Sequence, residues 1–330
     1  MNKIFKSYFK KKKILVTGGT GLIGKPLTSY LKNLGAIVTV VSLDKIKPIP
    51  GIKFIYGNLN NFSFCKKITK NKDYVFHLAG IKGSALVTKT KPSSFYVPLL
   101  MINTNIIEAC RLNKVKKTLY CSSIGAYQKS SIFKEKNFNF NSYPMDFFPG
   151  WAKRAAEIQI LSYKIQYKLN NFYIVRPSNV YGPGDNFDEK NAMVIPSLIK
   201  KITKLKERNT IEIWGDGNEI RDFIFSEDVA YGLIQTLYYG TKNYDFINIG
   251  SGIGVKIKKL VRILSEIKKF DYKFNKRKQK GFKKRIMDIS LSKRIIKFKP
   301  KVSLKDGLIQ TIDWYKKNQK EFKKKKNYFN

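Results

Sequence analysis

Three glycines spaced three residues apart stand near the start of the sequence, directly after a short apolar segment. Residues 14–17 have the apolar, β-branched character of a buried strand, and a helix-like segment follows at 22–34. In a strand–turn–helix unit, Gly18 permits the tight turn, Gly21 admits backbone amides to a pyrophosphate, and Gly24 lets the helix pack on the strand. The spacing therefore predicts a dinucleotide-binding turn. The alternative is a glycine-rich turn that binds no ligand.

An acidic residue follows the second expected strand at the distance typical of a ribose ligand. Asp44 lies twenty residues after Gly24, where a carboxylate can accept hydrogen bonds from the hydroxyls of an adenosine ribose. Lys45 and Lys47 come next, and their charges would also tolerate a 2′-phosphate, so the choice between NAD and NADP stays open. The alternative for Asp44 is a polar residue of a surface turn.

Strand-like and helix-like segments alternate from residue 14 to residue 177. Strands are expected at 14–17, 37–41, 54–56, 74–78, 118–122 and 172–176, and helices at 22–34, 99–112 and 151–169. This alternation predicts an α/β fold, a Rossmann-type doubly wound parallel sheet with right-handed crossovers. Ligands of such sheets bind beyond the carboxyl ends of the strands. The residues expected there are Gly18, Gly21, Leu22, Ile23, Gly24, Asp44, Leu78, Ala79, Gly80, Ser123 and Pro177.

The second half is less regular and predicts a smaller α+β substrate domain. We expect one domain at 1–178, to which 225–250 returns through a strand at 246–249, and a second at 179–330. Further helices are expected at 195–205, 228–239, 256–267 and 304–318. Residues 211–214 and 221–224 predict a small hairpin, and residues 1–13 a loose basic arm.

The net charge of +42 is the most unusual feature of the composition. A strongly basic chain can bind nucleic acid or an anionic membrane surface, but the lysines are spread over the whole sequence and no nucleic-acid motif accompanies them. We therefore expect a lysine-rich composition without a nucleic-acid or membrane partner.

Cysteine usage and the absence of targeting segments indicate a compartment. The three cysteines show no disulfide or metal spacing, no signal peptide opens the sequence, and no apolar run is long enough to cross a bilayer. We expect a cytoplasmic protein without a metal. His77, the one histidine, ends an apolar strand and is expected to be a packed core residue rather than a ligand or base.

Several short motifs are spread over nearly the whole chain. They are residues 17–24, 77–80 (His-Leu-Ala-Gly), Ser122-Ser123, Lys153, residues 176–184, 221–224 (Arg-Asp-Phe-Ile), 305–308 and Trp314-Tyr315. Together they resemble the extended short-chain dehydrogenase/reductase superfamily, and more narrowly its NAD-dependent nucleotide-sugar epimerases and dehydratases. Residues 185–187 and 191–196 look most like the GDP-L-fucose synthase branch. The resemblance implies NAD or NADP as cofactor, a nucleotide-diphosphate sugar as substrate, and a homodimer.

The family chemistry uses a Ser, a Tyr and a Lys. The Lys charge lowers the phenol pKa so that the Tyr can exchange a proton with the sugar hydroxyl, while the Ser bonds the same sugar oxygen. The resemblance places Ser123 and Lys153 in two of these roles. The Tyr position, four residues before the Lys, is Pro149, which has no acid–base group. We predict Tyr143 as the substitute, with Asp146 and Tyr127 as alternatives.

The resemblance also implies binding residues. Asn58 and Leu59 would lie near the adenine, Asn179 would hold the sugar or its diphosphate, and Arg221 with Arg285 would clamp the diphosphate. The alternative for Arg221 is an ion pair with Asp222 or Asp228. Residues 194–196 and Trp214 would border the nucleotide base.

Two positions depart from the fucose synthase branch. Ile124 and Gly184 stand where that branch has a Cys and a His that epimerise sugar carbons, so double epimerisation by that route is not expected. The implied function is NAD(P)-dependent epimerisation or reduction of a nucleotide sugar by hydride transfer at C4. Because Pro149 removes the family Tyr, the alternative is a NAD(P)-binding sensor or scaffold.

Overall fold

The main sheet contains seven parallel strands with β1 near its middle. The computed structural model describes residues 3–44, 49–188, 191–205, 210–241, 243–277 and 281–322. Within them the sheet order is β11-β7-β5-β4-β1-β2-β3, the doubly wound order that the alternation predicts. The strands are β1 (Lys13–Thr17), β2 (Ile37–Ser42), β3 (Lys53–Tyr56), β4 (Tyr74–His77), β5 (Lys117–Cys121), β7 (Phe172–Pro177) and β11 (Ile247–Ile249). The order reverses between β1 and β4, which is where such sheets open a crevice for ligands.

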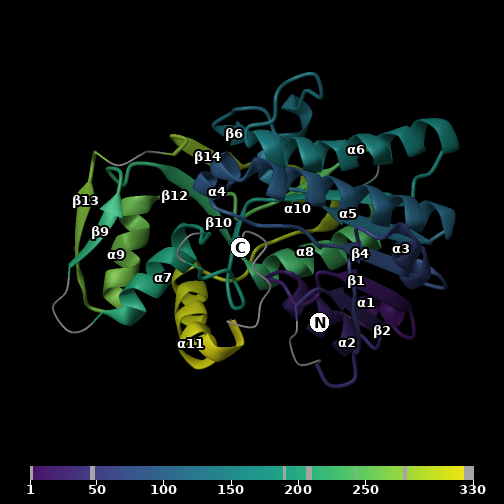
Figure 1. The fold of residues 1–330 in the computed structure, drawn as a ribbon, viewed down its shortest axis with the longest axis horizontal. Coiled ribbons are helices and arrows are strands. Elements are labelled where there is room, and N and C mark those ends of the chain that lie inside the picture. Colours follow the sequence, from purple (N-terminus) through teal and green to yellow (C-terminus); the bar gives the residue numbers. More distant parts are fainter. Residues whose placement is uncertain are drawn as a thin grey trace.

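Helices cover both faces of this sheet (Figure 1). One face carries α3 (Phe62–Thr69), α5 (Pro92–Leu112) and α6 (Phe147–Tyr167), and the other carries α1 (Lys3–Phe9), α2 (Gly24–Asn33), α8 (Ser226–Tyr239) and α10 (Ser290–Ile296). Successive β1 side chains enter opposite cores: Ile14 and Val16 pack in one and Leu15 in the other, as the two-residue period of a strand requires. Within the described residues, no helix has both the length and the apolar character needed to span a bilayer.

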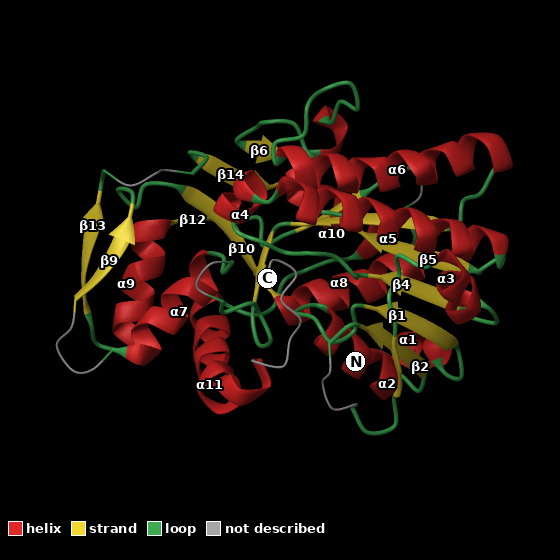
Figure 2. Cartoon of the chain, viewed as in Figure 1, coloured by secondary structure: helices red, strands yellow, loops and turns green. Residues whose placement is uncertain are grey.

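A second, mixed sheet is built around β10 (Figure 2). β10 (Ile220–Phe225) pairs in parallel with β8 (Asn179–Tyr181) and β14 (Lys284–Met287), and antiparallel with β12 (Gly254–Lys256); β6 (Ile132–Phe133) extends it beyond β14. Packed nearby are α7 (Val194–Lys204), α9 (Ile257–Ile267) and α11 (Leu304–Phe322), whose apolar residues share one core. The remaining elements are α4 (Ala85–Thr90) and the short 3₁₀ helices η1 (Ile124–Ala126) and η2 (Glu135–Asn137).

The predicted hairpin at 211–224 is wrong. Both strands form, but β9 (Thr210–Trp214) pairs in parallel with β13 (Asp271–Asn275), while β10 lies in the second sheet. Gly215 and Gly217 both have positive φ, and their turn directs β10 away from β9. The reason lies in burial: β10 is buried from Asp222 onward, whereas β9 alternates between buried and less buried positions at an edge.

The predicted loose arm at the N-terminus is also wrong. Residues 3–9 form α1, in which Phe5 and Phe9 are buried one helical turn apart. Their rings lie 5.1 Å from Tyr238 and 6.0 Å from Tyr74, both far along the chain. An apolar pair at i, i+4 gives a short helix a buried face, so the segment is anchored despite its lysines. The expected return of residues 246–249 to the main sheet is confirmed by β11, whereas the domain division at residue 178 stays a prediction.

Candidate active site

The backbone of the glycine turn packs directly against the segment after β4 and against the start of α2. Gly18 has φ +69°, and a Cβ there would lie 2.8 Å from the Ala79 nitrogen. A Cβ on Gly24 would overlap the Gly18 carbonyl oxygen, so α2 meets β1 as closely as the motif requires. A Cβ on Gly21 would lie 3.2 Å from the Gly18 oxygen, and apart from the neighbouring residues of the chain no further contact within 4 Å is seen among the described residues. The turn thus leaves its Gly21 side open for a pyrophosphate at the N-terminus of α2, and the backbone fits the cofactor.

The predicted ribose ligand lies next to this turn. Thr20, inside the glycine turn, donates its hydroxyl to Asp44 Oδ2 at 2.7 Å, and the Asp44 amide donates to Ser42 Oγ at 3.1 Å. These bonds bring the end of β2 to the end of β1. Lys45 and Lys47 lie outside the described residues.

The predicted adenine loop is held by a residue for which the sequence analysis assigned no role. Asn58 accepts the Asn60 amide at 3.0 Å, and the Leu59 carbonyl accepts Asn105 Nδ2 at 2.9 Å. Asn105 lies on α5, so this helix positions the loop after β3.

His77 lies in a polar network inside the core. One ring nitrogen lies 2.7 Å from Thr17 Oγ1 and the other 3.0 Å from Asn103 Oδ1. Burial, followed by the charge of Lys153, lowers the pKa of His77 to about 3. The interpretation of His77 as a packed core residue is confirmed. The Ala79 amide donates to Thr17 Oγ1 at 3.2 Å, so the network also positions the segment Leu78–Gly80 beside the glycine turn.

Ser123 and Lys153 come from adjacent elements at the end of β5. Lys153 Nζ donates to the Cys121 carbonyl at 2.8 Å and would lie 3.8 Å from a Cβ on Gly80. Burial lowers the pKa of its ammonium. Ser123 Oγ accepts the Gly125 amide at 3.1 Å. The structure therefore brings Gly80, Ser123 and Lys153 to neighbouring strand ends, β4 and β5, and Pro177 ends the next strand, β7.

Pro149 lies in the first turn of α6. The three residues that could replace the family Tyr differ in exposure and in their partners. Tyr143 is 74% exposed, with its ring stacked on Phe147; its predicted role stays a prediction. Tyr127 is buried and donates its hydroxyl to Asn248 at 3.0 Å. Asp146 precedes α6 and pairs with Arg285 at 2.8 Å.

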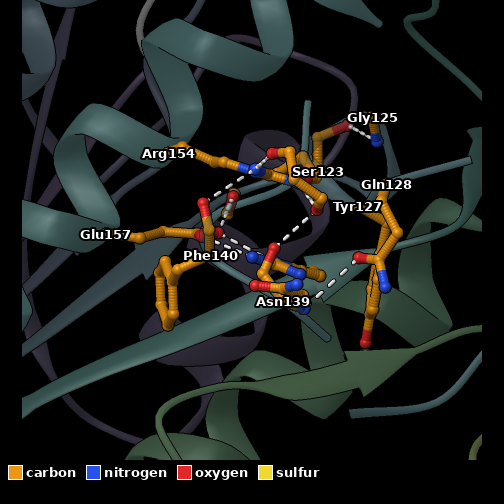
Figure 3. A network of polar contacts seen from close by, with 12 residues as sticks. Ser123, Gly125, Tyr127, Gln128, Asn139, Phe140, Arg154 and Glu157 are labelled. Atoms are coloured by element: carbon orange, nitrogen blue, oxygen red, sulfur yellow. Dashed lines mark hydrogen bonds and ion pairs between the residues drawn. The ribbon is translucent and has the colours of Figure 1, made fainter. Parts of the chain in front are cut away.

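Two buried arginines, Arg154 and Arg176, have roles that the sequence did not indicate, and Figure 3 shows Arg154 in the polar network around Ser123. Arg154 donates to the carbonyls of Ala126 at 2.6 Å and Phe140 at 3.3 Å, and so fixes the loop that leads to α6. Arg176 pairs with Glu157, which also accepts the Ser122 hydroxyl at 2.5 Å. An Arg at the end of a strand and a Glu four residues after a Lys are weak signals, because such residues are usually exposed.

The predicted sugar-binding residues lie on the second sheet. Arg221 and Arg285 are partners in adjacent strands, β10 and β14. Arg221 donates to the carbonyls of Ile220 and Phe282, and burial lowers its pKa to about 10, with a further contribution from the Arg285 charge. Asn179 donates to the Asp222 carbonyl at 3.0 Å.

The alternative ion pair for Arg221 is not formed with the two predicted carboxylates. Asp222 accepts from the hydroxyls of Ser178 and Ser251 and from three backbone amides, and Asp228 accepts from the Lys301 and Val302 amides. Near the expected base site, Trp214 is exposed while Ile195 and Pro196 are buried. Within the described residues, no group of three or more His, Cys, Asp or Glu side chains could hold a metal ion.

The fold and these residues define a Rossmann-type nucleotide-binding protein with a Ser and a Lys at the site. Residues 14–250 match the model of the NAD dependent epimerase/dehydratase family. The chain therefore belongs to the NAD-dependent epimerase/dehydratase family, whose cofactor is NAD or NADP.

Three known proteins illustrate the likeness. The chain is 30% identical over 320 residues to a probable GDP-L-fucose synthase 1 of Oryza sativa, covering 93% of this chain and 92% of that protein. It resembles a UDP-glucose 4-epimerase of Thermotoga maritima solved with UDP-glucose, with a TM-score of 0.80, 26% identity, and coverage of 93% and 99%. A GDP-L-fucose synthetase of Naegleria fowleri bound to NADP shares the fold at 22% identity, with a TM-score of 0.78 and coverage of 94% of each chain. These relatives are enzymes, as the family resemblance implies.

Proposed function

We propose that this chain is a NAD(P)-dependent nucleotide-sugar epimerase or reductase that acts at sugar C4. The observation that carries the proposal is the arrangement at the strand ends. The glycine turn, Gly80 and Ser123 follow the adjacent strands β1, β4 and β5, and Lys153 of α6 reaches the end of β5 through its bond to the Cys121 carbonyl. A bound nicotinamide would supply the acceptor and donor of hydride. In a Rossmann sheet this edge is where the nicotinamide and the sugar meet.

The residues of the main sheet would hold the cofactor. The glycine turn, with Leu22 and Ile23, would bind the pyrophosphate, and Asp44 the adenosine ribose. Lys153 would hold the nicotinamide ribose, and Ser123 would donate to the sugar C4 oxygen. The remaining contacts to the cofactor would come from Asn58, Leu59, Leu78, Ala79 and Pro177.

The second sheet would hold the diphosphate. Arg221 and Arg285 lie on adjacent strands, and a guanidinium pair is suited to a diphosphate because each can make two parallel hydrogen bonds to phosphate oxygens. Asn179 would reach the sugar or its diphosphate. Ile124 and Gly184 offer no acid–base group, which argues against epimerisation at further carbons by the fucose synthase route.

The test of the proposal is a titration followed by an assay. We expect purified protein to bind NAD or NADP, measured by calorimetry, and to convert at least one sugar of a UDP-, GDP- and dTDP-sugar panel. Folded protein that binds neither cofactor would contradict the proposal.

A second candidate, a NAD(P)-binding sensor or scaffold, is favoured by one observation: Pro149 replaces the only strong acid–base residue of the family motif. If the protein is such a sensor or scaffold, it should bind the cofactor and convert no sugar of the panel.

A cytoplasmic location stays a prediction from the sequence.

We also propose a homodimer formed through α5 and α6. The two helices pack together and expose Val97 and Met101 on α5, and Ile158 and Ile165 on α6. Burying such residues against a second copy would remove apolar area from water. Light scattering should give twice the chain mass, and Ile165→Glu should shift it toward the monomer.

A further inference from the structure

A carboxylate stands at the N-terminus of α6, near the position of the missing Tyr. Asp146 precedes Pro149 by three residues and Lys153 by seven. Asp146 immediately precedes the first residue of α6 and makes no capping hydrogen bond with its side chain. Its carboxylate is therefore not used to cap the helix.

The Asp146 carboxylate packs against the turn that contains Ser123. A Cβ on Gly125 would lie 2.5 Å from Asp146 Oδ2, and the Asp146 amide donates to the Gly125 carbonyl at 3.2 Å. The Gly125 amide in turn donates to Ser123 Oγ. Asp146 and Ser123 are thus on either side of one glycine.

The Asp146 carboxylate also contacts Arg285, which is predicted to bind the diphosphate. Both terminal nitrogens of Arg285 donate to Asp146, at 2.8 and 3.3 Å. The Asp146 side chain is 35% exposed and that of Arg285 is 12% exposed. Asp146 therefore lies between the predicted site of the sugar C4 oxygen, at Ser123, and the predicted diphosphate site, at Arg285. The sugar ring of a nucleotide sugar must span these two sites.

We propose that Asp146 takes the role of the missing Tyr and accepts the proton of the sugar C4 hydroxyl. This inference rests on the proposed function. The proton passes to an Asp146 carboxylate oxygen as the hydrogen on C4 leaves with its electron pair to the oxidised nicotinamide, so the sugar becomes the 4-keto form and the cofactor is reduced. Return of both to the sugar reverses the step.

The other two candidates are less suited. The Tyr127 hydroxyl is buried against Asn248, and burial raises its pKa. Tyr143 is exposed, and its ring lies against Phe147 and Trp151 on the outside of the loop.

The experiment compares Asp146→Asn with Asp73→Asn, a matched control. Asp73 also pairs with a cation, Lys116, at 2.8 Å, and lies before β4, away from the carboxyl ends of the strands. We expect Asp146→Asn to lower kcat for the sugar converted by wild type at least 100-fold, and Asp73→Asn to change it less than threefold. Tyr143→Phe, which tests the sequence-based prediction, should lose less than Asp146→Asn.

A binding measurement separates catalysis from positioning of Arg285. With UDP and GDP as calorimetric probes, Asp146→Asn should bind the preferred diphosphate as tightly as wild type or more tightly, because Arg285 loses a competing anion. Loss of binding with kcat retained would overturn the proposal, as would a Tyr143→Phe defect larger than that of Asp146→Asn. Wild type that binds cofactor and nucleotide sugar but converts none would also overturn it, whereas wild type that binds neither cofactor contradicts the proposed function itself.

Discussion

The cofactor side and the sugar side of the site are built in different ways. On the cofactor side, backbone atoms of β1, α2 and the segment after β4 meet at contact distance around Gly18 and Gly24. On the sugar side, charged side chains from distant parts of the chain meet in pairs: Asp146 with Arg285, and Lys82 with Asp185. The first arrangement admits almost no substitution, while the second can be rearranged by a ligand that competes for a charge.

This difference has a physical basis. Backbone packing excludes any side chain beyond hydrogen, so its disruption affects the fold and the cofactor together. An ion pair that is partly exposed contributes little to stability, because water compensates each charge when the pair opens. Substitutions on the two sides should therefore affect stability and binding in different proportions.

The largest effect is expected from Gly24→Ala. The added methyl group would overlap the Gly18 carbonyl and crowd Gly19 Cα at 2.6 Å, so α2 must move away from β1. We expect the free energy of unfolding to fall by about 3 kcal/mol and NAD(P) binding to be lost, as measured by urea unfolding and calorimetry. Gly80→Ala is the control for stability alone, because its Cβ would meet Leu99 at an ordinary 3.5 Å. Equal stability of Gly24→Ala and wild type would show that the backbone contact is dispensable.

A smaller loss of stability on the cofactor side should depend on pH, through His77. The folded-state pKa of His77, about 3, lies below its unfolded value near 6.5. The unfolded state therefore binds the proton first as the pH falls, and stability that is complete above pH 6.5 is lost progressively toward pH 3. Between pH 6.5 and 5 we expect a loss of about 2 kcal/mol.

Urea unfolding at several pH values measures this loss. His77→Gln can keep one hydrogen bond of the network but does not titrate, so its stability should decline less over the same pH interval. The same pH dependence in both proteins would assign the loss to other groups.

The cofactor side could be predicted from the sequence because its contacts are local. Gly18, Gly24 and Asp44 lie within one β-α-β unit, and the structure brings the glycine turn and Asp44 together; their roles toward a cofactor stay predictions. Ser123 and Lys153 were predicted to lie near each other from the family motif, and the structure places Ser123 just after β5 and the Lys153 ammonium on the carbonyl of Cys121, the last residue of β5. The core role of His77 followed from its place at the end of an apolar strand.

The sugar side could not be predicted in the same way because its contacts are not local. Asp146 and Arg285 are 139 residues apart, and neither has a local pattern that identifies the other. The error at β9 and β10 has the same origin: two glycines between strands favour a hairpin, but the pairing was decided by partners far along the chain. Arg176 is buried among the rings of Phe138 and Phe246, which an isolated Arg-Pro dipeptide does not indicate.

On the sugar side, Lys82→Met should have a moderate effect on stability. Lys82 Nζ lies 2.6 Å from Asp185 Oδ1 and links the segment after β4 to the loop after β8; its side chain is 40% exposed, and that of Asp185 is 1% exposed. Removing the ammonium leaves a buried carboxylate without this partner, although the exposed side of the pair admits water. We expect a loss of about 1 kcal/mol with NAD(P) binding unchanged, measured by urea unfolding and calorimetry. A loss as large as that of Gly24→Ala would remove the distinction between the two sides.

The smallest effect on stability should come from Asp146→Asn, the substitution for which we expect the largest loss of turnover. The Asp146–Arg285 pair is partly exposed, and asparagine can still accept a hydrogen bond from Arg285. We expect the free energy of unfolding to change by less than about 1 kcal/mol, in urea unfolding at neutral pH. If stability is retained while turnover is lost, the charges of the sugar side contribute to the reaction rather than to the stability of the fold. A loss near 3 kcal/mol would instead make Asp146 a structural group of the α6 N-terminus, and the contrast with Gly24 would then disappear.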